Sequence, residues 1–379
     1  MRIAVAREID SAEPRVAATP ETVKKLKGLG AEVVVEKGAG IRSGVLDADY
    51  EAAGAVIADT LHDVVADTDA LLKVRRPAPT ELAGSRKGML VVGLMDPFGN
   101  ETALAALAQT GVVAFAMELM PRITRAQVMD VLSSQANLAG YRAVIDAASE
   151  FGRALPMMMT AAGTVPAAKI FVMGAGVAGL QAIATARRLG AVVTATDVRP
   201  AAKEQVESLG AKFIAVEDAE FKQAETAAGY AKEMSKEYQA KQAALVADHI
   251  KKQDIVITTA LIPGRPAPRL ISKEMVASMR PGSVIVDLAI ERGGNCELAK
   301  PGVVEVDGVK IVAYLNVPGR LAASASSLYA RNLLAFLDIL IDKKTRALAV
   351  NWDDEIVKAT ALTRDGVVIH QNFQPKSAA

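Results

Sequence analysis

The chain of 379 residues is longer than one typical domain core requires, so we expect two domains. Its 51% hydrophobic and 23% charged residues are typical of a globular protein and exclude a disordered chain. The formal net charge of +1, with no basic stripe or charged tail, gives no reason to propose nucleic acid as a partner.

In the N-terminal third, short β-branched runs alternate with helical stretches. The expected strands are Ile3–Val5, Glu32–Glu36, Ala55–Ala58, Ala70–Val74, Leu90–Val92 and Val112–Ala114. Among the helices between them, Pro20–Gly28 has Thr19 as its N-cap and Pro20 at its first position. Alternating strands and helices favour a parallel sheet with helices on its faces.

Helical periodicity then runs from about Arg125 to Leu155, longer than an ordinary globular helix, with Gly140 inside it at a modest cost. We interpret this stretch as a connector between two domains. A second α/β series follows, with strands at Lys169–Met173, Val192–Thr196, Lys212–Ala215, Ile255–Thr258, Val284–Leu288 and Ile311–Ala313. Its expected helices are Val177–Leu189, Pro200–Leu209 and Tyr230–Lys252. Another long helix, Leu321 to Ile341, could return the chain to the first domain.

A glycine-rich run, GAGVAG at 174–179, directly follows the apolar strand Lys169–Met173 and opens a helix. This is the context that a dinucleotide-binding G-x-G-x-x-G motif requires. Gly174 permits the tight turn, Gly176 lets the backbone approach a pyrophosphate, and Gly179 lets helix and strand pack closely. The N–H groups and the dipole at the helix N-terminus favour phosphate charge.

Asp197 lies at the end of the next strand, ~20 residues beyond the glycines, where an acidic side chain can accept hydrogen bonds from adenosine ribose hydroxyls. Its carboxylate would repel a 2′-phosphate, so we expect NAD(H) rather than NADP(H). Arg199 is the opposing signal, because an arginine here can hold a 2′-phosphate. We give Asp197 more weight. A glycine turn without a ligand is the alternative, and the strand, turn, helix and acid together argue against it.

These patterns predict an α/β fold of two Rossmann-like domains with parallel sheets, the second inserted into the first and joined to it by the two long helices. The first domain would comprise residues 1–135 and 320–379, at both chain ends. The NAD-binding Rossmann domain would comprise residues 136–319.

The segment from Pro121 to Ser133 is a second candidate site. A helix over this segment would place three polar side chains, spaced three residues apart, near one face: Gln127, Asp130 and Ser133. Together with Arg122 they could present a polar cluster to a ligand. From the residues alone, a solvated helix face is the favoured interpretation.

Other residue types add few candidates. A single cysteine, Cys296, excludes an internal disulfide framework, suits a reducing environment and is interpreted as a structural or idle thiol. Three histidines, His62, His249 and His370, are far apart, so no metal site is expected. Met157–Met159 is interpreted as core filler. No run reaches the ~18 apolar residues that span a bilayer, and no signal region is seen, so we expect a soluble, cytoplasmic protein.

Several stretches resemble the NAD(H)-binding component of proton-translocating NAD(P) transhydrogenase, that is, domain I, which forms the first portion of the alpha subunit. They are EPRVA at 13–17, MELMPRI at 117–123, DVLSSQANLAGYR at 130–142, the glycine run at 174–179, KEQVESLG at 203–210 and TTALIPG at 258–264. The resemblance covers essentially the whole chain, and segment 122–133 is specific to that family.

The resemblance implies direct hydride transfer from NADH on this component to NADP+ on a separate NADP(H)-binding component, coupled to proton translocation by membrane-spanning subunits. It also suggests a homodimer that is peripheral at the cytoplasmic face of the inner membrane through its partners. Gln127, Arg122 and Asp130 would have catalytic roles. The cofactor-binding positions would be Arg122, Gln127, Asp130, Ser133, Gly174, Gly176, Val177, Gly179, Asp197, Val198, Arg199, Gly229 and Leu261.

The alternative is an enzyme like alanine dehydrogenase, a relative with the same architecture, which needs a substrate-binding arginine and lysine and a general acid/base. Arg15 and Lys73 match the first two. The acid/base histidine should fall between Val91 and Pro97, where Met95 stands, and a methionine cannot carry a proton. A third possibility, a regulatory NAD-binding module without catalysis, is disfavoured by the family-specific segment.

Overall fold

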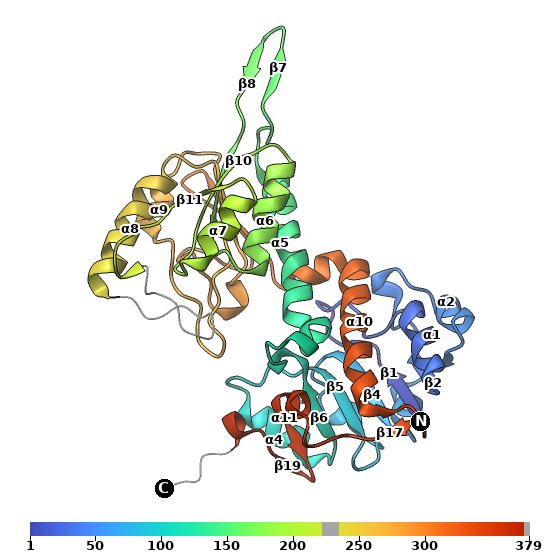
Figure 1. Ribbon diagram of the computed structural model, residues 1–379. Helices are drawn as coiled ribbons and strands as arrows, with labels where there is room; N and C mark the ends of the chain where they lie inside the picture. Colours follow the sequence, from blue (N-terminus) through green and yellow to red (C-terminus); the bar gives the residue numbers. More distant parts are fainter. Residues whose placement is uncertain (222–234, 375–379) are drawn as a thin grey trace. The chain divides into compact units, whose positions relative to one another are not determined.

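The computed structural model describes residues 1–221 and 235–374 (Figure 1). The chain forms two compact units: unit 1 contains Met1–Gln135 and Gly319–Ala379, and unit 2 contains Ala136–Pro318. Each unit is built on a largely parallel sheet with helices connecting the strands. The predicted α/β fold class is therefore confirmed.

Unit 1 has a six-stranded parallel sheet in the spatial order β3-β2-β1-β4-β5-β6. Its strands are β1 (Arg2–Val5), β2 (Glu32–Glu36), β3 (Val56–Ala58), β4 (Ala70–Arg75), β5 (Leu90–Leu94) and β6 (Val113–Ala116). Its helices are α1 (Pro20–Gly28), α2 (Asp47–Ala52), α3 (Leu61–Val65), α4 (Glu101–Gln109), α10 (Ala322–Leu340) and α11 (Glu355–Thr360). All six expected strands are present, because each is an apolar run bounded by polar turns.

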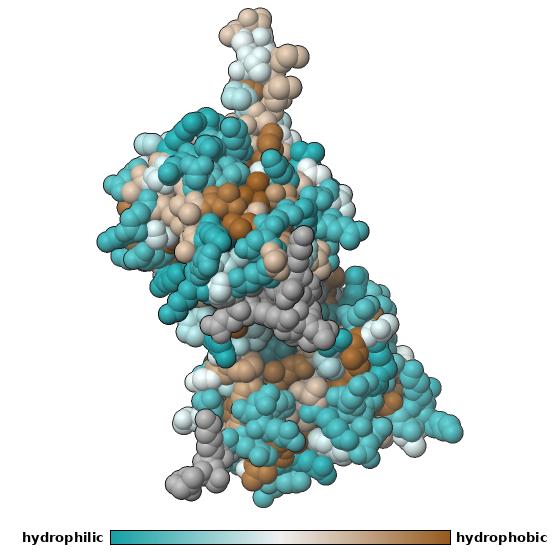
Figure 2. Space-filling view, turned by 60° about the vertical axis from the view of Figure 1, so that its left-hand side comes forward, coloured by the Kyte–Doolittle hydropathy of each residue, from teal (hydrophilic) through white to brown (hydrophobic). Residues whose placement is uncertain are grey.

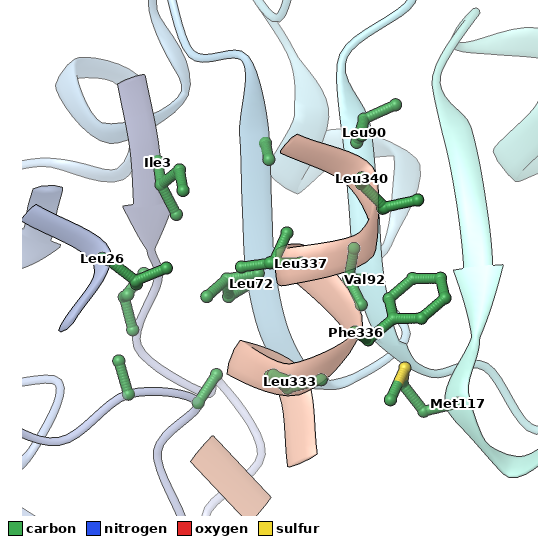
Figure 3. Close-up of a cluster of buried hydrophobic side chains, with 14 of the residues drawn as sticks. Ile3, Leu26, Leu72, Leu90, Val92, Met117, Leu333, Phe336, Leu337 and Leu340 are labelled. Atoms are coloured by element: carbon green, nitrogen blue, oxygen red, sulfur yellow. The ribbon is translucent and has the colours of Figure 1, made fainter. Parts of the chain in front are cut away.

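The long helix α10 completes the core of unit 1. Its buried side chains Leu333, Phe336 and Leu337 recur at helical spacing and point toward the sheet, where Leu72 and Val92 lie (Figure 3). Fully burying each such side chain stabilises the fold by roughly 1.5–3 kcal/mol. This packing explains why the end of the chain returns to unit 1.

Unit 2 has a seven-stranded sheet in the order β11-β10-β9-β12-β13-β15-β14. Its strands are β9 (Lys169–Met173), β10 (Val192–Thr196), β11 (Lys212–Phe213), β12 (Ile255–Thr258), β13 (Val284–Asp287), β14 (Gly302–Val306) and β15 (Val309–Ala313). Within this sheet of described strands only β14 is antiparallel, paired with β15 across a tight turn, and it is absent from the strands expected from the sequence. The helices are α6 (Val177–Arg188), α7 (Ala201–Ser208), α8 (Lys236–Ile250) and α9 (Lys273–Ala277). The expected start of α8, Tyr230, lies outside the described residues.

The prediction of one helix from Arg125 to Leu155 is wrong. Residues Thr124–Met129 form a 3-10 helix, η4, and the α-helix α5 spans only Val131–Glu150. The break is at Asp130, whose carboxylate accepts hydrogen bonds from the Ser133 N–H (2.9 Å) and the Ser133 hydroxyl (2.6 Å). Asp130 therefore acts as an N-cap that starts a new helix. No helix within residues 1–221 and 235–374 is both long enough and apolar enough to cross a membrane.

The interpretation of Met157–Met159 as core filler is also wrong. These residues belong to a hairpin of β7 (Met158–Thr160) and β8 (Gly163–Val165) that projects from unit 2 (Figure 1). The exposed fractions of Met157, Met158 and Met159 are 60%, 43% and 79%. Three consecutive apolar residues have no periodicity that distinguishes a buried face from an exposed one.

Gly140 is required by close packing inside unit 2. A Cβ atom at this position would lie 2.0 Å from the carbonyl oxygen of Ala178, in the first turn of α6. Only glycine allows α5 and α6 to approach this closely, which explains a residue that otherwise weakens a helix.

We expect Gly140→Ala to destabilise unit 2 by roughly 1–3 kcal/mol through overpacking, in spite of the better helix propensity of alanine. Gly152→Ala is the matched control, because a Cβ there would meet no described atom within 4 Å. Urea unfolding followed by circular dichroism measures both variants. A midpoint for Gly140→Ala equal to or above that of the native chain would contradict the close approach.

Glu118 is a half-buried and incompletely paired carboxylate of unit 1, in the 3-10 helix η3 (Met117–Leu119). Its Oε1 accepts hydrogen bonds from the N–H groups of Met95 (2.8 Å) and Asp96 (2.5 Å). Its Oε2 is buried and finds no hydrogen-bond partner within residues 1–221 and 235–374. Burial raises the pKa of Glu118 to about 7.

A pKa raised from 4.5 to about 7 in the folded state means that stability is lost as pH rises from about 4.5 to about 7. We expect Glu118→Gln to match the native chain at pH ~5 and to exceed it at pH ~8 by about 3 kcal/mol at most, since the amide stays neutral. Trp352, the single tryptophan, packs against the unit 1 core, so its fluorescence follows unfolding of this unit in urea. Equal differences at both pH values would refute the assignment.

Candidate functional site

The carboxyl ends of β9 and β12 lie where the strand order of unit 2 reverses. Ligands of open α/β sheets bind at such a switch point. The segments that follow the two strands are joined here, because Thr259 donates its N–H to the carbonyl oxygen of Met173 (2.9 Å) and its hydroxyl to that of Gly174 (3.0 Å). The turn after β9 is thus held by the neighbouring strand.

The three glycines of the turn between β9 and α6 differ in backbone conformation and in the space around the missing Cβ atom. Gly174 has φ +104°, a conformation that favours glycine. A Cβ on Gly179 would lie 1.8 Å from the carbonyl oxygen of Gly174. Gly176, the N-cap of α6, has no described atom within 4 Å of its missing Cβ. The backbone is therefore open to a ligand at Gly176 and packed against the protein at the other two.

Asp197 follows β10 directly and is held by the glycine turn. Its Oδ2 accepts a hydrogen bond from the Ala175 N–H (2.7 Å), and its Oδ1 accepts one from the Arg199 N–H (2.9 Å). The guanidinium of Arg199 adds two more, Nε to Oδ1 (2.9 Å) and Nη2 to Oδ2 (3.0 Å). The carboxylate thus lies beside the N-terminus of α6 and forms a bidentate ion pair with Arg199.

Three of the expected contact residues are exposed apolar side chains that follow adjacent strands. Val177, Val198 and Leu261 come after β9, β10 and β12, with exposed fractions of 40%, 43% and 54%. Apolar surface at the carboxyl edge of a sheet can pack against the flat face of a ring system. Gly229, another expected contact, lies outside the described residues.

Asn295 positions the loop that carries Leu261 and is not among the residues expected from the sequence. Its buried side chain accepts a hydrogen bond from the Ala260 N–H (3.1 Å) and donates to the carbonyl oxygens of Ala260 (2.9 Å) and Pro268 (2.8 Å). No local sequence signal marks a residue that acts across such a separation. Its neighbour Cys296 is buried, and burial raises the pKa of the thiol to about 11, as a structural thiol requires.

In unit 1, the 3-10 geometry of η4 determines which side chains share a face. With three residues per turn, residues i and i+3 are aligned along the helix. Ala126 and Met129 form the buried row, whereas Gln127 is exposed and Asp130 follows it by three positions at the start of α5. Arg122 is exposed just before η4, and Ser133 is half-buried and bonded to Asp130.

Two contacts from distant parts of unit 1 anchor η4. Arg125 forms a bidentate ion pair with Asp354 (2.7 and 2.9 Å), the N-cap of α11, and this contact lowers the pKa of Asp354. Asn332 in α10 donates to the carbonyl oxygen of Val128 (2.8 Å) and accepts from the Ser134 hydroxyl (2.7 Å). The segment that carries Gln127 is therefore fixed at both ends.

Arg15 and Lys73, the two cations that suggested an amino-acid substrate, are buried in ion pairs of unit 1. Arg15 is 3% exposed and pairs in bidentate fashion with Glu13 (2.6 and 2.7 Å). Lys73 is 1% exposed and lies 2.5 Å from a carboxylate oxygen of Glu81. Met95 is fully buried in an apolar cluster. Both cations already have carboxylate partners within the chain.

The expected site residues fall into two groups. The glycine turn, Val177, Asp197, Val198, Arg199 and Leu261 belong to unit 2, and Arg122, Gln127, Asp130 and Ser133 belong to unit 1. The unit 2 group fits a dinucleotide. It combines an open backbone at Gly176, a helix N-terminus whose first intrahelical bond comes only at Leu180 (2.8 Å to Gly176 O), and an acid at the end of the next strand.

The matches to known proteins cover almost the whole chain. The N-terminal domain of the alanine dehydrogenase/PNT family matches residues 4–139, and its C-terminal domain matches residues 143–371. In Rhodospirillum rubrum, the polypeptide named as the first portion of NAD(P) transhydrogenase subunit alpha is 56% identical over 98% of this chain and 98% of its own length. The crystal structure of transhydrogenase from Sinorhizobium meliloti is 65% identical, with a TM-score of 0.89, over 97% of this chain and all of that one (100%).

A more distant relative is alanine dehydrogenase of Halomonas elongata, which is 30% identical over 98% of this chain and 95% of its own length. Identity is thus higher on the transhydrogenase side of the family. The chain belongs to the alanine dehydrogenase/PNT family and, within it, to the group of NAD(P) transhydrogenase alpha subunits.

Proposed function

We propose that this chain is the NAD(H)-binding subunit of a proton-translocating transhydrogenase. It passes hydride directly between NADH in its own site and NADP+ on a partner subunit, and separate membrane-spanning subunits couple the transfer to proton translocation. The chain is then peripheral at the cytoplasmic face of the inner membrane through these partners. The names of its relatives support the activity.

The observation that carries the proposal is the junction of the glycine turn with Asp197. The Ala175 N–H fixes the carboxylate at 2.7 Å, beside a helix N-terminus that is open at Gly176. A carboxylate in this position accepts hydrogen bonds from ribose hydroxyls and disfavours a 2′-phosphate, so NADH is preferred over NADPH. When bound, the reduced dinucleotide supplies the hydride.

The residues of η4 orient the reacting end rather than move protons. Gln127 is neutral and exposed, on a segment anchored by Arg125 and Asn332. An amide on a fixed support can hold a nicotinamide in a reactive geometry, which can account for several kcal/mol of barrier. Arg122 and Asp130 supply charge beside it. Direct hydride transfer needs no general acid or base at this step.

The alternative activity, oxidation of alanine, needs Arg15 and Lys73 to hold a substrate. Both are buried and paired with Glu13 and Glu81, and Met95 offers no proton. The observations therefore favour the transhydrogenase over the dehydrogenase.

The test is an assay of the purified chain with and without an NADP(H)-binding transhydrogenase subunit. We expect NADH oxidation that depends on both NADP+ and the partner, and no NADH formation from L-alanine and NAD+. Formation of NADH from alanine would establish the alternative. Tight NADH binding with neither activity would support a regulatory module.

We expect Gln127→Ala to retain NADH affinity within ~10-fold, about 1.4 kcal/mol, because the main binding groups belong to the glycine turn and Asp197. Its rate of hydride transfer to NADP+ on the partner should fall by much more. Stopped-flow transfer and equilibrium NADH binding are measured on the same preparations. The control is Gln109→Ala, the same change at an exposed position at the end of α4.

An unchanged rate for Gln127→Ala would make Gln127 an ordinary surface residue. Parallel losses of rate and affinity would make it a binding residue rather than an orienting one.

The β7–β8 hairpin supports the further proposal that the chain is a homodimer. The hairpin is white to light brown in the hydropathy view, with few hydrophilic residues (Figure 2). A two-stranded hairpin is marginally stable in water by itself, and exposed methionines adapt to a partner surface. A pocket at its foot, lined by Phe151, Met158 and Val165, offers an apolar counterpart on every copy of the chain. Reciprocal contacts between two copies can cover both surfaces.

We expect Met157→Glu/Met159→Glu to shift the chain from dimer to monomer in sedimentation velocity, because charge is placed in the apolar contact. Val367→Glu is the control, since Val367 is 58% exposed on unit 1. A dimer that survives the double substitution would exclude the hairpin as the interface.

A further inference from the structure

Arg199 uses the same carboxylate oxygens that a ribose would need. Two backbone N–H groups and two guanidinium nitrogens donate to Asp197 at 2.7 to 3.0 Å. A carboxylate offers about four lone-pair positions, so these donors fill it. The Asp197 side chain is 7% exposed, whereas that of Arg199 is 28% exposed. The carboxylate is therefore fixed, and the guanidinium is the more exposed partner of the pair.

We propose that Arg199 is able to bind a 2′-phosphate but that its ion pair with Asp197 prevents this. Through this ion pair, Asp197 keeps the chain selective for NADH. The inference rests on the proposed function in one respect, namely that Asp197 faces the adenosine ribose. Selectivity then has two components. The Asp197 carboxylate repels the 2′-phosphate, and its ion pair with Arg199 keeps this arginine from binding the phosphate.

NADH and NADPH differ in the hydrogen-bonding groups that they present to Asp197. Ribose hydroxyls are donors, so they can replace the Nε and Nη2 bonds of Arg199, while the N–H groups of Ala175 and Arg199 keep the carboxylate in place. A 2′-phosphate presents acceptor oxygens to the Asp197 carboxylate, which is itself an acceptor. It therefore cannot replace the hydrogen bonds that Arg199 donates. Arginine binds phosphate in the same bidentate manner in which it binds a carboxylate. Removing the carboxylate charge should therefore turn Arg199 toward the phosphate.

Asp197→Asn is the variant that separates charge from shape. The amide oxygen can still accept from the Ala175 N–H, but it no longer forms an ion pair with Arg199. The probes are 5′-AMP and 2′,5′-ADP, which differ only in the 2′-phosphate, with binding measured by competition against NADH fluorescence and by calorimetry. We expect Asp197→Asn to bind 2′,5′-ADP at least ten-fold more tightly than the native chain does, with a much smaller change for 5′-AMP.

The double variant Asp197→Asn/Arg199→Ala should lose this gain, and Arg199→Ala alone should show none. Asp197→Asn/Arg188→Ala is the matched control, because it removes a different, exposed arginine of α6 and should keep the gain. Asp197→Ser replaces Asp197→Asn if the latter has a lowered melting temperature, and the same ten-fold gain is expected.

Three results would overturn the inference. The first is a gain that persists without Arg199, and the second is a gain that also disappears in the Arg188 control. The third is no gain in either Asp197 variant while NADH and 5′-AMP still bind. A native chain that binds neither NADH nor 5′-AMP refutes the proposed function itself, and with it the assignment of Arg199, so the two failures are distinguishable.

Discussion

The contact between Gly179 and the carbonyl oxygen of Gly174 is the constraint on which the dinucleotide region of unit 2 depends. A Cβ would lie 1.8 Å from that oxygen, so only glycine lets α6 begin so close to the end of β9. The same oxygen accepts the Thr259 hydroxyl from the end of β12 (3.0 Å). The next residue, Ala175, donates to Asp197 at the end of β10 (2.7 Å). One tight turn thus joins three strands and orients the Asp197 carboxylate.

Much of this region could be predicted because its determinants are local. The parallel strands are short apolar runs, and the glycines stand between a strand and a helix at a spacing with a known physical reason. The contacts that hold the region could not be predicted in the same way. Asn295 acts on Ala260 across 35 residues, and Arg125 reaches Asp354 across 229. Polar residues in ordinary loop sequences give no signal until the fold brings them together.

The η4 segment shows a different limit of sequence reasoning. Over six residues, periods of 3.0 and 3.6 place apolar residues almost identically, so the pattern predicts a continuous α-helix where a 3-10 turn and an N-cap occur. The difference matters for chemistry. The cap at Asp130 commits the carboxylate to Ser133 and fixes the start of α5. Gln127 precedes this cap by one 3-10 turn, and contacts within unit 1 fix the backbone on both sides of it.

Two of the bidentate arginine–carboxylate pairs, Arg15–Glu13 and Arg199–Asp197, are both formed through Nε and Nη2 but differ in burial. The Arg15–Glu13 pair is 3% and 0% exposed, so separating it would leave uncompensated charges in the core. It is therefore a fixed element of unit 1. The Arg199 side chain is 28% exposed, so water can solvate the guanidinium when it moves away. Of these two pairs, the Arg199–Asp197 pair is therefore the one whose arginine can be exchanged, as the proposed contact of Asp197 with a ribose requires.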